Sequence, residues 1–509
     1  MFEGFDETFH YGFVQSLSTH RALPVLGRDT VSEEMWQALQ LQPVSHYIQA
    51  STGAPVNFGE YFRLTNEQRV EMRRRLESLP AGEKYQAHSG LLNYEVNQPP
   101  ITYVLAAIPD GLMSGFPITW RVLAVRLLLS VTSVVLIYIG MKMLGSAVFA
   151  RWWLAATFCV FCSQMLYASI CHVCNDSLAV PAMIFFIWST VRALQQPSRK
   201  TFAILAVMLS LALLTKVYFI FEVPLAMAIV AWHLWRRKAT FANAGLFVAI
   251  LAVTTGPWFY RNATLYHNLT GTSDKAAGFG PRQLLETFAR LPWLDSITYM
   301  ATSSIWTGNN SFTTFSSRSL FAVLLLLAAS AVFYVLHRKE WRAPEMAMLA
   351  SILLFCGGLL YITLAFFYST KGAVNAAMPW YMQVLLPPVM LLAFLSMSRS
   401  GTIGRVLAIG TLLAWTYLIA ATYAIKLLPL YGGFTGTRAH VSDLWSWYRD
   451  KGAERSSILG TMCLTPAWWI YALTAAVLML AFTVCAILIR GISARAASAR
   501  GPHGGPEVS

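Results

Sequence analysis

Charged residues are scarce in this sequence. Asp, Glu, Lys and Arg make up 12% of its 509 residues, whereas hydrophobic residues make up 56%. A soluble domain of this length needs far more charge to cover its surface. Several apolar runs instead reach the roughly 20 residues that a helix needs to cross a hydrocarbon core about 30 Å thick. The composition therefore excludes an ordinary soluble protein and predicts a multi-pass membrane protein.

Two kinds of binding motif are also absent. No glycine-rich loop opens a helix after a strand, and no nucleic-acid-binding module is recognisable. The first absence leaves no sequence sign of a nucleotide-binding loop, and the second argues against a nucleic-acid partner. The formal net charge of +14 is interpreted instead as partly topogenic, because basic residues orient membrane proteins.

Cysteine is rare, with seven residues in the chain. Four of them form a C-x2-C-x8-C-x2-C pattern that resembles zinc-ligand spacing: Cys159, Cys162, Cys171 and Cys174. The first pair lies inside an apolar run and the second near its outer end, so one zinc ion would have to bridge two depths of the membrane. We interpret the four as small buried hydrophobic residues, with a Cys171–Cys174 disulfide as the alternative.

The apolar runs predict an all-α polytopic membrane protein with about eleven membrane-spanning helices. They lie near residues 122–144, 147–169, 176–195, 202–216, 218–235, 243–262, 318–336, 345–367, 380–397, 404–424 and 467–489. Only Lys216 and Val217 separate the fourth run from the fifth, so these two could instead form one long bent helix.

Basic residues fall in alternate connections between the predicted spans. They are Lys142 and Arg151; Arg192, Arg199 and Lys200; Arg236, Arg237 and Lys238; Arg338, Lys339 and Arg342; Arg399 and Arg405; and Arg490. Cytoplasmic connections carry an excess of Lys and Arg, so these connections are predicted to be cytoplasmic.

The chain then divides into an outer N-terminal segment (1–121), a transmembrane domain (122–489) and a short cytoplasmic tail (490–509). The outer side also holds the loops 263–317 and 425–466, although the second contains five Lys or Arg residues.

The N-terminal segment contains no predicted span, yet the alternation of charge places it outside. No signal peptide with a basic and an apolar region precedes it. A polar segment of about 100 residues is hard to translocate without a leading helix, so we expect a membrane helix upstream of residue 1. The alternative is a miscount by one crossing, which would place this segment in the cytoplasm.

The N-terminal segment is predicted to fold, not to be disordered. Thr65 and Gln68 form a capping box, and apolar residues recur at helical spacing until Pro80. This helix is interpreted as a solvated amphipathic helix, or alternatively as one that lies on lipid headgroups. A second helix, Pro99–Met113, is too short to span a membrane and is placed in the interface.

Two adjacent acids and a histidine stand close to the start of the chain: Asp6, Glu7 and His10. On a helix, Glu7 and His10 share a face while Asp6 points elsewhere. A carboxylate at a membrane surface can act as a general base, and a neighbouring histidine can bind phosphate or a metal ion. On the residues alone, a solvated helix face remains the alternative.

Further ionisable residues lie near the outer ends of the predicted spans, namely Arg126, Asp176, Lys216 and Arg261. Ionisable residues at membrane depth are costly and usually functional. Acids and bases gathered at one interface indicate a polar reaction on a lipid-anchored anion. Structural roles are the alternatives: Lys216 as a snorkelling side chain, Asp176 as a helix cap and Arg261 as an interfacial anchor.

The order of these features resembles the GT-C superfamily of lipid-linked-sugar glycosyltransferases, especially its protein O-mannosyltransferases and bacterial aminoarabinose transferases. The matching motifs are Asp6-Glu7, Gln98-Pro99-Pro100 with Tyr103, Asn175-Asp176, Leu214-Thr215-Lys216 and Trp258…Arg261-Asn262. The resemblance covers about residues 1–400. Many members have an Arg-Tyr pair that opens a late helix; here Trp380-Tyr381 stands in that place and leaves Tyr381 as the candidate.

The resemblance implies a glycosyltransferase that works by single displacement, with inversion, at the outer face of the membrane. Asp6 would be the general base, with Glu7 beside it. Lys216, Arg261 and His10 would hold the phosphate of a polyprenyl-phosphate sugar donor. The other candidate site residues are Asp176, Gln98, Arg126 and Tyr381.

The remaining expectations concern cofactor, partners and location. No cofactor is required by the implied mechanism, and a divalent metal held by Glu7 and His10 is left open. The acceptor is a protein, a lipid or a glycan. The expected location is a cell membrane, in particular a bacterial inner membrane, with the site facing the periplasm or the exterior.

Two other classes of function remain as alternatives. A transporter or flippase of lipid-linked or polar substrates would show related halves with broken helices in matching positions. No such repeat is found in the sequence. The third class is a non-catalytic membrane subunit, because a fold alone does not fix a function.

Overall fold

The computed structural model describes residues 6–81, 86–271, 279–305, 317–372, 379–434 and 441–498. Within these ranges the chain is helical apart from its connections and one two-stranded antiparallel sheet. The sheet pairs β1 (Thr30–Ser32) with β2 (Ala87–Leu92) in the N-terminal segment. The predicted all-α polytopic fold is confirmed.

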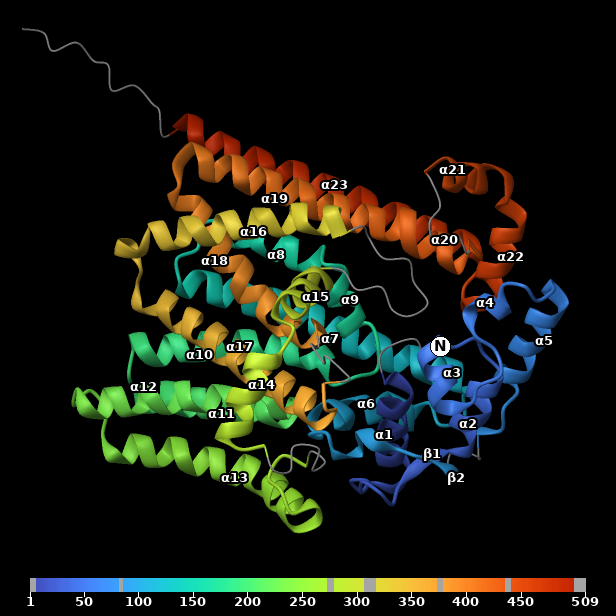
Figure 1. The fold of residues 1–509 in the computed structure, drawn as a ribbon, viewed down its shortest axis with the longest axis horizontal. Helices are drawn as coiled ribbons and strands as arrows, with labels where there is room; N and C mark the ends of the chain where they lie inside the picture. Colours follow the sequence, from blue (N-terminus) through green and yellow to red (C-terminus); the bar gives the residue numbers. More distant parts are fainter. Residues whose placement is uncertain are drawn as a thin grey trace, which may run out of the picture.

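Long helices occupy the predicted spans (Figure 1). They are α7 (Ile118–Ala147), α10 (Asp176–Gln195), α11 (Arg199–Thr215), α12 (Val223–Trp235), α13 (Phe241–Tyr266), α16 (Ser317–Leu336), α17 (Ala343–Ser369), α18 (Leu386–Arg399), α19 (Gly401–Ala421) and α23 (Ala467–Ser498). In the part of the chain that the structure describes, nine helices are long and apolar enough to cross a membrane. The number rises to ten if one bent pair counts as a span.

The bent pair replaces the single span predicted at 147–169. It consists of α8 (Trp153–Phe161) and α9 (Gln164–Ile170), whose axes differ by 68°. At the break, the Ser163 hydroxyl donates to the Cys159 carbonyl (2.9 Å) and accepts from the Trp415 indole N–H (2.8 Å). The polar groups exposed by the bend are therefore hydrogen-bonded inside the protein, as apolar surroundings require.

The two runs on either side of Lys216 form two helices, not one. The helix α11 ends at Thr215, Lys216 is extended (φ −152°, ψ 133°), and the 3-10 helix η3 (Val217–Glu222) leads into α12. Figure 1 shows α11 and α12 side by side, and the two helices are in contact. The chain therefore reverses direction at Lys216 and places this residue at the end of two helices.

The connections rich in basic residues gather at one end of the helices. Figure 1 shows the α12–α13, α16–α17 and α18–α19 connections at its left edge and the N-terminal segment at its right. The short 3-10 helix η4 (Arg338–Glu340) lies in the second of these connections. This separation is the one that the alternation of charge along the sequence predicts.

The N-terminal segment consists of short helices that cover the other end. They are α1 (Glu7–His20), α2 (Glu33–Gln40), α3 (His46–Thr52), α4 (Phe58–Tyr61), α5 (Asn66–Glu77), the 3-10 helix η2 (Tyr94–Asn97) and α6 (Ile101–Leu112). The capping box predicted for α5 is present: Thr65 Oγ1 accepts from the Gln68 N–H, and Gln68 Oε1 accepts from the Thr65 N–H. On α6, Val104, Ile108 and Leu112 form one exposed apolar face, as expected of a helix at a membrane interface.

A buried ion network fixes this segment to the spans. The fully buried Arg121 of α7 pairs with Asp110 of α6 at 2.9 Å and with Glu34 of α2. The hydroxyl of Tyr11 on α1 donates to Asp110 at 2.6 Å. A buried charge is tolerated when it is paired and hydrogen-bonded, so the network holds three helices of the N-terminal segment against α7.

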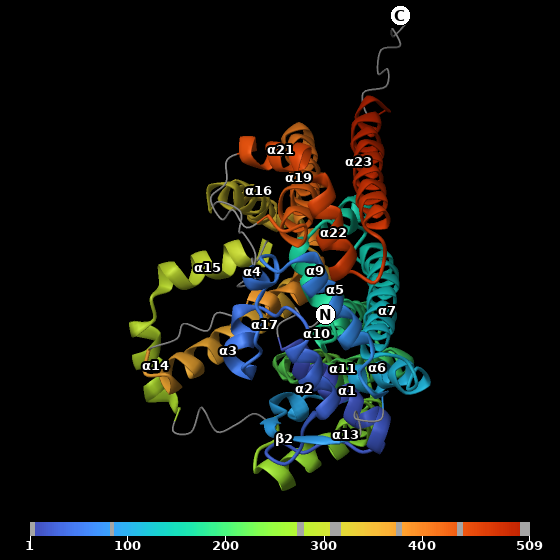
Figure 2. The ribbon, with the colours of Figure 1, turned by 90° about the vertical axis from the view of Figure 1, so that its right-hand side faces the viewer.

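Two further groups of helices lie in the loops predicted on the outer side. The loop after α13 contains α14 (Pro281–Arg290) and α15 (Trp293–Ile305). The loop after α19 contains the π-helix η6 (Thr422–Leu427), α20 (Leu428–Tyr431), α21 (Val441–Asp450) and α22 (Gly452–Met462). Figure 2 shows α14 and α15 on the side of the molecule opposite to α7 and α23. The end of α15 supports the 3-10 helix η5 (Pro379–Leu385), since Gln383 donates to the Ser304 carbonyl at 2.7 Å.

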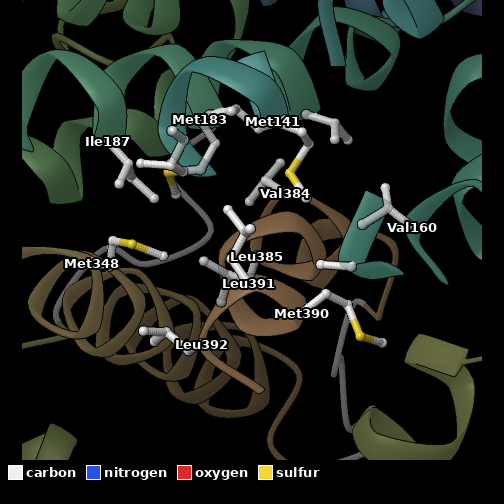
Figure 3. Packing of buried hydrophobic residues seen from close by; sticks show 14 of the residues in the cluster. Met141, Val160, Met183, Ile187, Met348, Val384, Leu385, Met390, Leu391 and Leu392 are labelled. Atoms are coloured by element: carbon white, nitrogen blue, oxygen red, sulfur yellow. The ribbon is translucent and has the colours of Figure 1, made fainter. Parts of the chain in front are cut away.

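The core between the spans is closely packed and rich in methionine. Figure 3 shows Met141 of α7, Met183 of α10, Met348 of α17 and Met390 of α18 meeting around Leu385. Unbranched thioether side chains adapt to irregular gaps between helices. All seven cysteines are free thiols in the structure, so the Cys171–Cys174 disulfide considered above is not formed.

Replacing Gly358 with alanine is expected to destabilise the protein by about 1–3 kcal/mol, because the added carbon overpacks the core. A Cβ at this position of α17 would overlap the ring of Phe221 on η3. Thermal unfolding in detergent checks this result. Gly357→Ala is the matched control, because a Cβ there meets nothing within 4 Å. Equal stability of the two variants would contradict the close contact of Phe221 with α17.

Candidate active site

A small cavity of about 40 Å³ lies where the N-terminal segment meets the spans. Its lining comes from distant parts of the sequence: Asp6, His10, Glu95, Gln98, Ala168, Ser169, His172, Cys174, Asp176, Lys216, Trp380 and Tyr381. A cavity of this volume holds water but not a sugar, so a substrate would have to widen it. Most of the candidate residues from the sequence are thus brought together.

Asp6 is held at the start of α1 in an uncommon conformation. It is the N-cap residue, in the left-handed region (φ 56°, ψ 12°), which Asp tolerates better than most residues. Its carbonyl accepts the first helical hydrogen bonds, from Phe9 and His10, but its carboxylate does not cap the helix. The carboxylate instead accepts a hydrogen bond from the Tyr94 hydroxyl and faces the cavity. Strained backbone of this kind is often found at functional sites.

Burial changes the acidity of Asp6. It raises the pKa of the carboxyl above its ordinary value, while the hydrogen bond from Tyr94 and the charge of Lys216 act in the opposite direction. A carboxylate whose pKa is raised is a stronger base than one in water.

Glu7 points away from this cavity. Its carboxylate accepts from Arg126 Nε (2.8 Å) and Nη2 (2.6 Å), and from the backbone N–H of Val173 (2.8 Å). Burial alone would raise the pKa of Glu7, but the charges of Arg126 and His172 and these hydrogen bonds hold it at about 2. Glu7 is therefore an ionised clamp that fixes α1 to α7 and to the turn before α10, and Arg126 is its partner.

Asp6 and His10 both line the cavity. Helical spacing had instead predicted that His10 would share a face with Glu7. The difference arises because Asp6 precedes the helix and its left-handed backbone turns the carboxylate inward. His10 Nδ1 lies 2.7 Å from the Tyr103 hydroxyl and 3.8 Å from Glu95 Oε2. Burial and the charge of Lys216 lower the pKa of His10 to about 3. His10 is therefore neutral and has no charge with which to hold a phosphate.

Lys216 and Asp176 form a buried ion pair at 2.5 Å. The extended break between α11 and η3 places Lys216 in the cavity wall, and the first turn of α10 places Asp176 opposite it. The ammonium lies 4.6 Å from the ring centroid of Tyr381 and 5.5 Å from that of Tyr218, within range of cation–π attraction. Lys216 is 5% exposed, so it does not snorkel to the surface.

Gln98 and Arg261 occupy different positions relative to this pair. Gln98 lines the cavity and accepts from Asn175 at 3.0 Å. Arg261 does not line it: Nη2 donates to the Pro24 carbonyl (2.6 Å), and the guanidinium lies over the rings of Trp258 and Tyr266. The expected joint contact of Lys216 and Arg261 with one phosphate is thus not formed inside the cavity.

Glu95 is an acid of the cavity that the sequence did not mark as a site residue. It is 9% exposed, and its Oε2 is buried without a hydrogen-bond partner. Burial, aided by the nearby Asp6 carboxylate, raises the pKa of Glu95 to about 8. The only signal in the sequence is its place three residues before Gln98-Pro99-Pro100, inside an otherwise uncharged stretch.

The residue pair considered for a metal does not fit one. Glu7 is engaged by Arg126, and His10 by Tyr103. Among the residues that the structure describes, no group of three or more His, Cys, Asp or Glu side chains is arranged to hold a metal ion.

These features define a polytopic membrane protein with a buried cluster of acidic and basic side chains at one end of its helices. Residues 97–258 match the model of the family described as dolichyl-phosphate-mannose-protein mannosyltransferase. The match includes Gln98, Arg126, Asp176 and Lys216, and it confirms the predicted resemblance to the GT-C superfamily.

Two solved structures are similar to the chain over most of its length. They are crystal structures of ArnT from Cupriavidus metallidurans, one bound to undecaprenyl phosphate and one in the apo state. Each is 15% identical to this chain, with a TM-score of 0.41, and the alignment covers 91% of this chain and 76% of that one. No curated protein matches the sequence.

Proposed function

We propose that this protein is a glycosyltransferase that moves a sugar from a polyprenyl-phosphate carrier to an acceptor. The observation that carries the proposal is the Asp6 carboxylate in one buried cavity with the Lys216 ammonium. The match of residues 97–258 to a mannosyltransferase family model supports it. A base and a fixed cation are the two groups that displacement of an anionic lipid phosphate requires.

The reaction is a single displacement with inversion. Asp6 takes the proton from an acceptor hydroxyl, whose oxygen attacks the anomeric carbon of the sugar. The bond from that carbon to the phosphate oxygen breaks, and polyprenyl phosphate leaves with the electron pair. Lys216 offsets the charge that grows on the leaving phosphate, and Asp176 keeps the ammonium in place at 2.5 Å.

The reaction takes place at the outer face of the membrane. The cavity is lined by residues of the N-terminal segment, by Asp176 at the start of α10 and by Lys216 directly after α11. Figure 1 shows the N-terminal segment at the end of the helices opposite to the connections rich in basic residues. The excess of Lys and Arg in those connections supports a cytoplasmic position for them. In a bacterial inner membrane the cavity then faces the periplasm, where the acceptor is a protein, a lipid or a glycan.

A transporter is the weaker explanation of the same residues. Transporters of lipid-linked or polar substrates hold them near the middle of the membrane, between broken helices in related positions of two halves. Here the ionisable residues of the cavity gather at one end of the spans.

Transfer by the purified protein in proteoliposomes tests the proposal. We expect the protein to release free polyprenyl phosphate from at least one member of a panel of polyprenyl-phosphate sugars, in step with the appearance of a glycosylated acceptor. Vesicles without protein are the control. Movement of labelled donor between the two leaflets without release of polyprenyl phosphate would contradict the proposal and identify a flippase.

A further inference from the structure

The environment of Glu95 sets it apart from the other acids of the cavity. The 3-10 helix η2 presents it, and η2 is tied to α1 because the Asn93 amide donates to the Phe9 carbonyl at 2.9 Å. Asp176 is paired with Lys216, and Asp6 accepts from Tyr94. Glu95 Oε2 has no hydrogen-bond partner although it is buried. A buried oxygen left without a partner is costly unless a ligand supplies one.

The charges around the cavity restrict the state of Glu95. The titratable groups that line the cavity with it are Asp6 just before α1, His10 of α1, His172 and Cys174 before α10, Asp176 of α10, Lys216, and Tyr381 of η5. Tyr103 of α6 also interacts with it electrostatically. His10 is neutral, and among the described residues that line the cavity Lys216 is the one Lys or Arg, with His172 as the remaining basic side chain. An ionised Glu95 would add a third carboxylate beside one ammonium, in the place where an anionic phosphate has to enter.

We propose that Glu95 is a further catalytic residue, a neutral carboxylic acid that donates a hydrogen bond through its O–H to the phosphate of the sugar donor. This inference rests on the proposed function. Glu95 remains protonated throughout: the acceptor proton goes to Asp6, the sugar–phosphate bond breaks, and the phosphate leaves between Lys216 and the Glu95 O–H. Asp6 returns its proton to solvent when the products depart.

The raised pKa of about 8 agrees with this role. A buried carboxylic acid kept neutral near pH 7 is an established kind of hydrogen-bond donor to developing negative charge. Asp6 and Glu95 then have complementary roles, because one must be ionised to accept a proton and the other must be protonated to donate a hydrogen bond.

Two substitutions separate this role from the alternatives. Glu95→Gln keeps an N–H donor and cannot ionise, so transfer should remain within a few-fold of the intact protein. Glu95→Leu removes the donor and should lower kcat by about 10²- to 10³-fold.

The pH dependence is a second test. In the intact protein, transfer should fall as the pH rises through about 8, because the acid form of Glu95 is lost. The Glu95→Gln variant should lack this decline. Glu33→Gln, in the same segment but outside the cavity, is the matched control and should behave like the intact protein.

Each contrary result has a distinct meaning. A Gln variant as slow as the Leu variant would show that Glu95 must give or take a proton, which overturns the proposal. An unchanged alkaline decline in Glu95→Gln would assign that decline to another group and would also overturn it. Binding of polyprenyl phosphate is a readout independent of turnover: it should weaken above pH 8 in the intact protein and not in Glu95→Gln. That binding pattern without sugar transfer would retain the role of Glu95 in phosphate binding and reject the proposed function.

Discussion

Replacing Asp6 with asparagine is expected to lower the rate of sugar transfer by about 10²- to 10⁴-fold, the usual contribution of a general base. An amide cannot accept the proton of the acceptor hydroxyl. The fold should survive, because asparagine also tolerates the left-handed backbone (φ 56°) that this position adopts. Stability should change little, since the Asp6 carboxylate does not cap α1.

Release of polyprenyl phosphate, measured with intact protein and Asp6→Asn in parallel proteoliposomes, checks this prediction. Asp295→Asn is the matched control, because Asp295 is an exposed acid in the first turn of α15. Donor binding should be retained in Asp6→Asn, since the base acts on the acceptor. Transfer at the rate of the intact protein would remove Asp6 from its role as the general base.

The architecture was largely predictable because the membrane imposes simple rules. Apolar runs of sufficient length predicted the membrane-spanning helices. The capping pair Thr65 and Gln68 predicted the start of α5. The bend between α8 and α9 was not predictable, because the apolar sequence continues through it. The bend depends on Ser163 and on Trp415, which lies far away in the chain.

The site was predictable in its residue types and not in its contacts. Asp6, Asp176 and Lys216 could be placed at the same end of the spans from topology alone, and the structure brings them to one cavity. Topology places Arg261 at the same end of the spans, yet its guanidinium donates a hydrogen bond to the Pro24 carbonyl and does not line the cavity. Topology fixes the height of a residue in the membrane, whereas the direction of its side chain depends on tertiary packing.

Glu95 is the opposite case, a residue of the cavity that its local sequence does not identify. Its unusual character comes from burial beside Asp6, and these two residues are far apart in the sequence. Isolated glutamates in polar stretches are common on protein surfaces, so nothing local distinguishes this one. Glu7, which the sequence placed beside Asp6 in the site, instead forms an ion pair with Arg126.

Replacing Lys216 with methionine is expected to destabilise the protein by about 3–5 kcal/mol and to lower sugar transfer by about 10²- to 10³-fold. The stability loss arises because Asp176 is left as a buried charge without its partner. The activity loss arises because the leaving phosphate loses a fixed positive charge. Methionine retains most of the length of the lysine side chain, so the change in packing is small.

The double variant Lys216→Met/Asp176→Asn separates the two effects. Replacing both members of a buried ion pair with uncharged residues of similar size is often close to neutral, so most of the lost stability should return, as measured by thermal unfolding in detergent. Transfer should not return, because no cation then faces the phosphate. Recovery of both stability and transfer would show that Lys216 acts only as the structural partner of Asp176. The charge on the leaving group would then have to be met elsewhere, for which Arg261, with its buried and unpartnered Nη1, is the next residue to replace.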